Sequence, residues 1–153
     1  MKNSSHIICL GNHSEWLAMV AHGIKDCRTW CKEKAARLFD LMLPGDCYIV
    51  PMPSHSGPPI QMFDVAYMLE RMGKGRKVYK CLFTLPHKSS YEAKKDGDDI
   101  DIEMMLVGHA PPDDLPTYII DNVVCSGKTA GAALKVLPDA TVVALTRSKK
   151  RKG

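Results

Sequence analysis

The chain has 153 residues, of which 45% are hydrophobic and 25% charged, and its formal net charge is +4. This length and balance predict one soluble globular domain, and no apolar run approaches the roughly 20 residues that a membrane-spanning helix needs. The six cysteines include no Cys-x-x-Cys pair. We therefore expect reduced thiols in a cytoplasmic protein, rather than a disulfide framework or a zinc site.

The first third of the chain predicts a strand, a helical region and a second strand. Residues 6–10 form a short apolar run, which predicts the first strand. Apolar side chains then recur at three- and four-residue steps over residues 16–42, which predicts one helix or two. Trp16 belongs to this pattern, and we expect both Trp16 and Trp30 in the core. The apolar residues 47–53 predict the next strand.

The second strand leads into a loop of small residues and prolines. This loop runs from Pro53 through Ser54, His55, Ser56 and Gly57 to two further prolines. A helix is predicted over residues 62–72, and a third strand of the sheet over residues 77–84. On composition alone the loop is either a surface turn or a ligand-binding loop, since small residues allow close approach of the backbone.

A long polar segment separates the third predicted strand from the next one. Residues 85–99 are too polar for a core and too long for a tight turn, and long polar loops are usually functional or disordered. Lys94 and Lys95 lie within this segment. Residues 100–107 alternate in part between polar and apolar, which predicts the returning arm of a β-hairpin flap.

The most informative stretch is residues 117–134. A run of β-formers ends at Asp121, Asn122 follows, and a helix is predicted from residue 130. Between them lies a small polar loop made of Cys125, Ser126, Gly127, Lys128 and Thr129. A strand, a loop of small residues and a helix N-terminus together form an anion site, because loop amides and the helix dipole favour negative charge there.

The last predicted strand, residues 140–146, is apolar without alternation, as expected for a parallel sheet covered on both faces. Strands that alternate with helices predict an α/β fold with a doubly wound, mainly parallel sheet flanked by helices. Ligands of such sheets bind at the carboxyl ends of the strands. The loops at residues 53–57 and 125–129 both lie there.

Residues 121–129 resemble the signature of the type I phosphoribosyltransferase family. In that family two acidic residues and two apolar residues precede a Ser/Thr-Gly-x-Thr loop, and here Asp121 and Asn122 stand at the acidic pair. Asn122 departs from the family, which usually has Asp. Residues 50–55, Val-Pro-Met-Pro-Ser-His, are weakly similar to the competence-protein F branch, and the segment around Lys94 and Lys95 to the orotate branch.

The resemblance implies a fold, a reaction and a set of site residues. The fold would be type I phosphoribosyltransferase-like with a flexible β-flap. The reaction would transfer the phosphoribosyl group of phosphoribosyl pyrophosphate (PRPP) to a nitrogen acceptor of the nucleobase type, releasing pyrophosphate. The protein would then be a glycosyltransferase of nucleotide metabolism that uses Mg²⁺. We expect a homodimer, no membrane partner and no specific nucleic-acid partner.

The same resemblance assigns roles to individual positions. Asp121 and Asn122 would hold the ribose hydroxyls, with Asp121 reaching the metal only indirectly, through those hydroxyls or water. Lys94 and Lys95 would meet the leaving pyrophosphate. The loop that binds the 5-phosphate would be Cys125, Ser126, Gly127, Lys128 and Thr129. The loop that binds the pyrophosphate would be Pro53, Ser54, His55, Ser56 and Gly57.

Other interpretations of the same residues stay open. A catalytically inactive PRPP- or nucleotide-binding regulatory protein is favoured by Asn122, which brings no negative charge. Residues 126–129 also match the end of a P-loop, although position 122 holds Asn where that motif needs Gly, so a degenerate P-loop nucleotidase is a third hypothesis. A plain strand–turn–helix without a ligand is the structural alternative.

The domain boundaries follow from these assignments. Residues 1–146 are expected to form the single α/β domain, with any hood over the acceptor within residues 1–46 and a flexible loop at residues 85–103. Residues 147–153 carry five positive charges and form a basic C-terminal tail. Such a run is usually a solvated tail, and alone it gives only salt-sensitive attraction to an anion.

Overall fold

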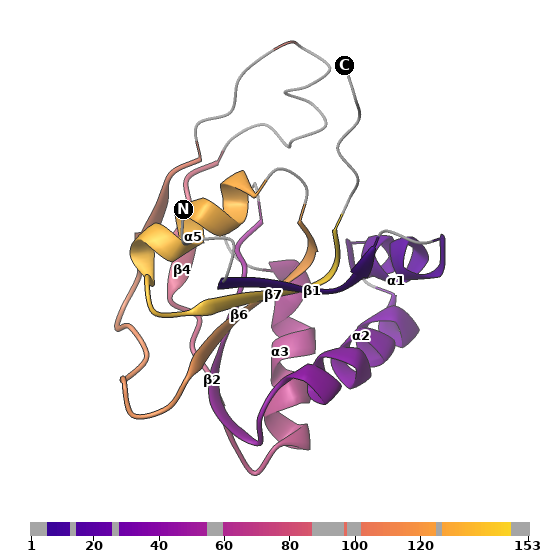
Figure 1. The fold of residues 1–153 in the computed structure, drawn as a ribbon, viewed down its shortest axis with the longest axis horizontal. Helices are drawn as coiled ribbons and strands as arrows, with labels where there is room; N and C mark the ends of the chain where they lie inside the picture. Colours follow the sequence, from indigo (N-terminus) through magenta and orange to yellow (C-terminus); the bar gives the residue numbers. More distant parts are fainter. Residues whose placement is uncertain are drawn as a thin grey trace.

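A computed structural model describes residues 6–12, 15–25, 28–54, 60–86, 97, 102–124 and 127–147. Its main feature is a five-stranded sheet in the order β1-β7-β6-β2-β3, in which every pairing is parallel (Figure 1). The elements in chain order are β1 (Ile7–Asn12), α1 (Glu15–Lys25), α2 (Thr29–Met42), β2 (Asp46–Pro51), α3 (Ile60–Met72), β3 (Gly75–Val78), β4 (Leu82–Thr84), β5 (Met104–Leu106), β6 (Thr117–Val124), α5 (Lys128–Val136) and β7 (Thr141–Arg147).

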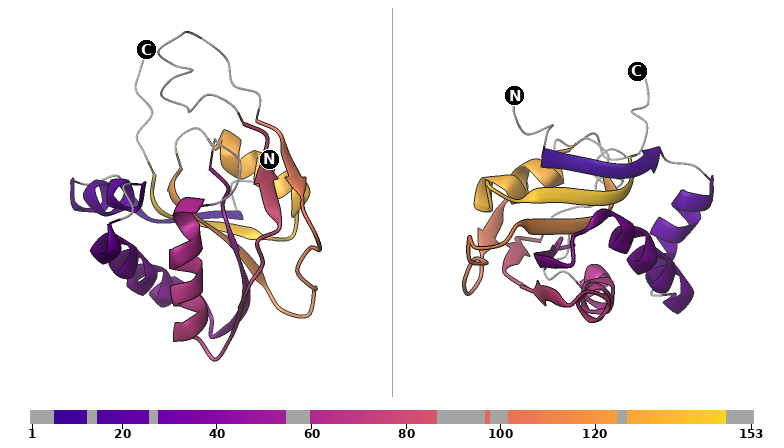
Figure 2. Two further views of the ribbon diagram at one scale, coloured as in Figure 1. Left: turned by 180° about the vertical axis from the view of Figure 1, so that it is seen from behind. Right: turned by 60° about the horizontal axis from the view of Figure 1, so that its bottom comes forward.

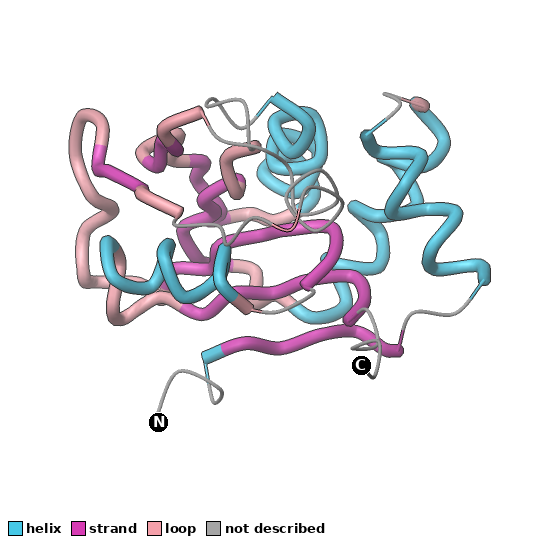
Figure 3. The backbone as a smooth tube through the Cα atoms, turned by 90° about the horizontal axis from the view of Figure 1, so that it is seen from above, coloured by secondary structure: helices cyan, strands magenta, loops and turns pink. Residues whose placement is uncertain are grey.

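Helices cover both faces of the sheet. Helices α1, α2 and α3 lie on one face, and α5 lies on the other together with the β4–β5 hairpin (Figures 1 and 2). Figure 3 views the molecule from above and shows β1 along one margin of the sheet. The predicted α/β class, with a mainly parallel sheet flanked by helices, is therefore confirmed. None of the helices in the described part of the chain is long and apolar enough to cross a lipid bilayer.

Alternation along the central strands explains the two layers. Successive side chains of a strand point to opposite faces, so each buried strand supplies two cores. On β2, Ile49 belongs to the core under α1–α3 and Val50 to the core under α5. On β7, Val143 and Val142 divide in the same way. The unbroken apolar runs of the sequence thus correspond to strands that are buried on both sides.

The connections reverse direction at the centre of the sheet. From β2 the chain passes through α3 to β3, on one side of β2, whereas from β6 it passes through α5 to β7, on the opposite side of β6. Strands β2 and β6 pair with each other, so the strand order reverses between them. Such a switch point leaves a crevice at the carboxyl ends of the two strands.

The helical region, predicted as one helix or two, divides into α1 and α2, and α1 ends at Lys25. Two local predictions need correction. The strand predicted over residues 77–84 is also divided: β3 ends at Val78, and β4 leaves the main sheet to pair antiparallel with β5. Trp16 and Trp30 were expected in the core, but they are 43% and 46% exposed. Trp16 follows the apolar period of α1 but lies outside its buried stripe, whereas Trp30 lies on the side of α2 that carries the exposed Glu33 and Lys34.

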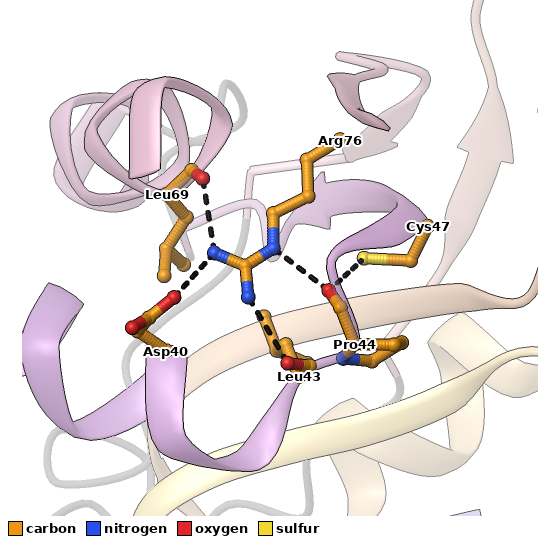
Figure 4. A network of polar contacts seen from close by, with 6 residues as sticks. All are labelled: Asp40, Leu43, Pro44, Cys47, Leu69 and Arg76. Atoms are coloured by element: carbon orange, nitrogen blue, oxygen red, sulfur yellow. Dashed lines mark hydrogen bonds and ion pairs between the residues drawn. The ribbon is translucent and has the colours of Figure 1, made fainter. Parts of the chain in front are cut away.

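A buried arginine joins the ends of two helices to the sheet (Figure 4). Arg76 of β3 is 7% exposed, and its guanidinium forms an ion pair with Asp40 at 2.6 Å. It also donates hydrogen bonds to the carbonyl oxygens of Pro44 at 2.8 Å, Leu43 at 3.0 Å and Leu69 at 3.2 Å. These carbonyls lie at the C-terminal ends of α2 and α3, where the helix dipole favours a cation.

We expect Arg76→Met to lower the free energy of unfolding by about 3 kcal/mol, since it leaves several buried acceptors without a donor. Chemical denaturation followed by circular dichroism measures the loss. The matched control is Lys32→Met: Lys32 pairs with Asp64 at 2.6 Å, but Asp64 is 59% exposed. That pair should contribute less than about 1 kcal/mol. Equal losses in the two variants would contradict the role given to Arg76.

Candidate functional site at the carboxyl ends of β2 and β6

The two loops singled out from the sequence begin side by side. Strands β2 and β6 pair up to Pro51 and Ile120, and the backbone N–H of Met52 then donates to the carbonyl oxygen of Ile120 at 2.9 Å. Pro53, which is buried, and Ser54, which is half-buried, continue from there. The start of the predicted pyrophosphate loop therefore leaves the sheet next to Asp121 on the neighbouring strand.

Three residues separate the end of β6 at Val124 from the start of α5 at Lys128. Gly127 is its N-cap, with φ of 85° in the left-handed region that favours glycine, and its carbonyl accepts the first helical bond from Gly131 at 2.8 Å. Within the described part of the chain, no side chain caps this helix end. The first-turn residues are Lys128, which is exposed, and Thr129, which is half-buried. The positive end of the helix dipole thus lies beyond the carboxyl end of β6.

Asp121 and Asn122 point to opposite faces of β6, as adjacent residues of a strand must. Asp121 is half-buried, and its Oδ1 accepts a hydrogen bond from the backbone N–H of Asn122 at 2.8 Å. The Asn122 side chain lies toward α1: its Nδ2 donates to the carbonyl oxygen of Ala21 at 3.3 Å. The two positions that the sequence pairs as ribose ligands are therefore separated by the sheet.

The contact of Asn122 gives a physical reason for the amide at this position. The side chain is 7% exposed, its nitrogen reaches a helix carbonyl, and its oxygen accepts the backbone N–H of Val123 at 2.9 Å. An aspartate can accept the second bond, but when ionised it has no donor for the carbonyl of Ala21. The sequence carried no signal for this role, because α1 and β6 are about a hundred positions apart.

Several predicted site residues lie outside the described residues. These are Lys94 and Lys95, the loop residues His55, Ser56 and Gly57, and Cys125 with Ser126. The described members are Pro53, Ser54, Asp121, Asn122, Gly127, Lys128 and Thr129, and all follow the carboxyl ends of β2 and β6 or lie in their last residues. Over the described part of the chain, no group of three His, Cys, Asp or Glu side chains is placed to hold a metal ion.

One further polar side chain at this end of the sheet escaped the sequence analysis. Thr146 of β7 lies opposite Val123 of β6, and it is fully buried. Its Oγ1 makes no hydrogen bond within the described structure. A threonine inside an apolar strand gives no sequence signal, because β-branched residues are common in strands.

A second contact fixes the chain just before β6. The hydroxyl of Tyr48 on β2 donates to Oδ1 of Asp114 at 2.6 Å, and its ring packs edge-on against Tyr79 with centroids 5.2 Å apart. The backbone N–H of Tyr48 donates to the carbonyl oxygen of Pro116 at 2.9 Å. The hydrogen bond to Asp114 raises the pKa of Tyr48 to about 12, and burial of the phenol acts in the same direction.

Comparison with known proteins identifies no relative: no protein-family model matches the chain, and no curated protein matches its sequence.

We expect Asn122→Asp to destabilise the protein by about 1–3 kcal/mol at neutral pH, because a buried carboxylate would face the carbonyl of Ala21. Burial raises the pKa of such a carboxyl, and the protonated acid can donate as the amide does. The destabilisation caused by Asn122→Asp should therefore become smaller as the pH falls. Thermal unfolding at neutral and acidic pH, with Asp121→Asn as the control, tests this; a loss that is independent of pH would argue against the Asn122–Ala21 contact.

Tyr48 should make the free energy of unfolding depend on pH in the alkaline range. Its folded-state pKa of about 12 lies above the ordinary value of 10.0, so this contribution to stability is complete below pH 10 and is lost as the pH rises toward 12. We expect the free energy of unfolding to fall more steeply over that window in the wild type than in Tyr48→Phe. The difference in tyrosinate absorbance between the two proteins gives the pKa of Tyr48 directly, and a value near 10 would refute the assignment.

Proposed function

We propose that this protein binds PRPP at the carboxyl ends of β2 and β6 and transfers its phosphoribosyl group to a nitrogen acceptor of the nucleobase type. One observation carries the proposal: the two loops that resemble phosphoribosyltransferase loops follow neighbouring strands on either side of the switch point. A diphosphate-bearing sugar needs anion-binding groups at both of its ends. Two loops that leave the sheet together at a crevice supply that arrangement.

The N-terminus of α5 is the proposed 5-phosphate site. Its first-turn amides carry the partial positive charge of the helix, and an anion there needs no cationic side chain. Gly127 allows close approach of the backbone, because its φ of 85° suits glycine and no atom of the described residues lies within 4 Å of the place a Cβ would take. The side chain of Thr129, in the same turn, is half-buried and adds a hydroxyl donor.

Asp121 is the proposed ribose ligand. It follows Ile119, which is buried under α5, and Ile120, which is buried under α1–α3, and the neighbouring strand β2 continues into Pro53 and Ser54. A carboxylate at this place accepts hydrogen bonds from sugar hydroxyls and stabilises positive charge that develops on the sugar as pyrophosphate leaves. The protein's contribution would be mainly to position the reactants and exclude water.

The donor set suits Mg²⁺ bound with the substrate. Mg²⁺ keeps several waters and is usually held by one or two carboxylates together with substrate phosphates. Asp121 is a half-buried carboxylate of this kind. When bound, the ion would neutralise charge on the departing pyrophosphate. Asp121 would reach it through ribose hydroxyls or water, which matches a single carboxylate rather than a protein cage.

A second candidate function is binding of PRPP or a nucleotide without turnover. The observation that favours it is the placement of Asn122, whose amide is bonded to α1 across the sheet from Asp121. The site then offers one negative charge to the sugar instead of two. A regulatory protein needs only the affinity that the helix N-terminus and Asp121 provide, whereas transfer also needs charge stabilisation in the transition state.

Titration calorimetry with PRPP, with and without Mg²⁺, tests the proposal, and ATP titrated in parallel tests the nucleotidase alternative. We expect Mg²⁺-dependent binding of PRPP that falls at least tenfold in Asp121→Ala. The matched control is Asp139→Ala, since Asp139 is exposed in the turn before β7, at the opposite end of the sheet. Unchanged binding in Asp121→Ala, or a preference for ATP, would overturn the PRPP site.

Turnover separates the two candidate functions once binding is established. Release of pyrophosphate from PRPP in the presence of a panel of nucleobases identifies a transferase. Binding without release for every base supports the regulatory function. A protein that binds neither PRPP nor ATP leaves the strand–loop–helix as a purely structural element.

A further inference from the structure

Among the described residues, one edge of the backbone of strand β5 pairs with no other strand. In the β4–β5 hairpin the N–H of Val107 donates to Cys81 at 2.8 Å, and the N–H of Leu85 donates to Glu103 at 3.1 Å. Residues of a strand alternate in the direction of their backbone groups. Positions 103, 105 and 107 therefore bond toward β4, whereas Met104 and Leu106 direct their N–H and C=O groups to the other side.

This open edge is apolar. Met105, Leu106 and Val107 are 45%, 43% and 49% exposed, and they are consecutive. Within the described ranges β4 is the only strand that pairs with β5, and β5 lies at the outer margin of the molecule in both the front and the rear view (Figures 1 and 2). Proteins usually protect an exposed edge with charge, proline or a bulge, because it can pair with another strand.

We propose that this edge pairs with β5 of a second copy of the chain, antiparallel about a two-fold axis at Met105. The register follows from the backbone: the extended stretch 103–107 is centred on residue 105, and both outward-facing residues then bond. Met104 pairs with Leu106 of the partner subunit and Leu106 with Met104 of the partner subunit, which gives four backbone hydrogen bonds. The two-stranded hairpin becomes a four-stranded sheet with a self-complementary interface.

The charge at the start of β5 is compatible with this arrangement. Glu103 is exposed at one end of the extended stretch. An antiparallel pairing keeps the two copies of Glu103 at opposite ends of the interface, where they do not repel.

The test begins with sedimentation velocity of the full chain at micromolar concentrations, where we expect a dimer. Leu106→Pro removes an outward-facing N–H and no bond of the β4–β5 hairpin, so it should give a monomer with an unchanged circular dichroism spectrum. Leu106→Ala keeps the N–H and should remain at least partly dimeric. A monomeric wild type, or a Leu106→Pro protein that stays fully dimeric, would overturn the proposal.

Cysteine cross-linking tests the register separately. A pair that is not hydrogen-bonded across an antiparallel interface has its Cα atoms about 4.5 Å apart, within the range that a disulfide spans. Met105→Cys should therefore give a covalent dimer on mild oxidation, with the 105–105 link identified by mass spectrometry. Val107→Cys is the control, because its two copies would be roughly 14 Å apart. Absence of the 105 link, or an equally efficient link at 107, contradicts the two-fold axis.

Discussion

The packing of the helical layer depends on the ion pair and hydrogen bonds that the buried guanidinium of Arg76 makes. A guanidinium that is 7% exposed is tolerated because it has one carboxylate and three backbone carbonyls as partners. Those carbonyls end α2 and α3, so the same group satisfies the C-terminal acceptors of two helices and attaches both to β3. Gly73, at the end of α3, has room for no side chain, because a Cβ there would collide with Arg76.

Arg76 thus holds α2 and α3 against β3. Other hydrogen bonds position helix α1 and the chain that enters β6. Helix α1 is held at its middle by Asn122, and the chain entering β6 is held by Tyr48 and Asp114. Both contacts involve the two central strands, β2 and β6. The proposed ligand site therefore lies on strands that these contacts hold in place, as a preorganised anion site requires.

How much the sequence predicts depends on whether the signal is local. The apolar runs of β2, β6 and β7, and the glycine before α5, were enough for the parallel sheet and its strand–loop–helix units. Period alone did not separate the buried stripe of α1 from its border, so the expectation that Trp16 lies in the core was wrong. The same expectation for Trp30 was also wrong, because its side of α2 is exposed. The partner of Asn122 is also a long-range contact that no spacing predicts. The antiparallel pairing of β4 with β5, outside the main sheet, was not predicted either, because it is also a long-range contact.

The step from Asp121 to Asn122 has a consequence for how this protein can change. Because the strand sends one side chain to each face, a substitution at the first position would alter what the proposed site can bind, while a substitution at the second alters how α1 is held. The two positions are joined through the carboxylate of Asp121, which accepts the backbone N–H of Asn122. The second position carries the stricter constraint, because its side chain is a buried hydrogen-bond donor.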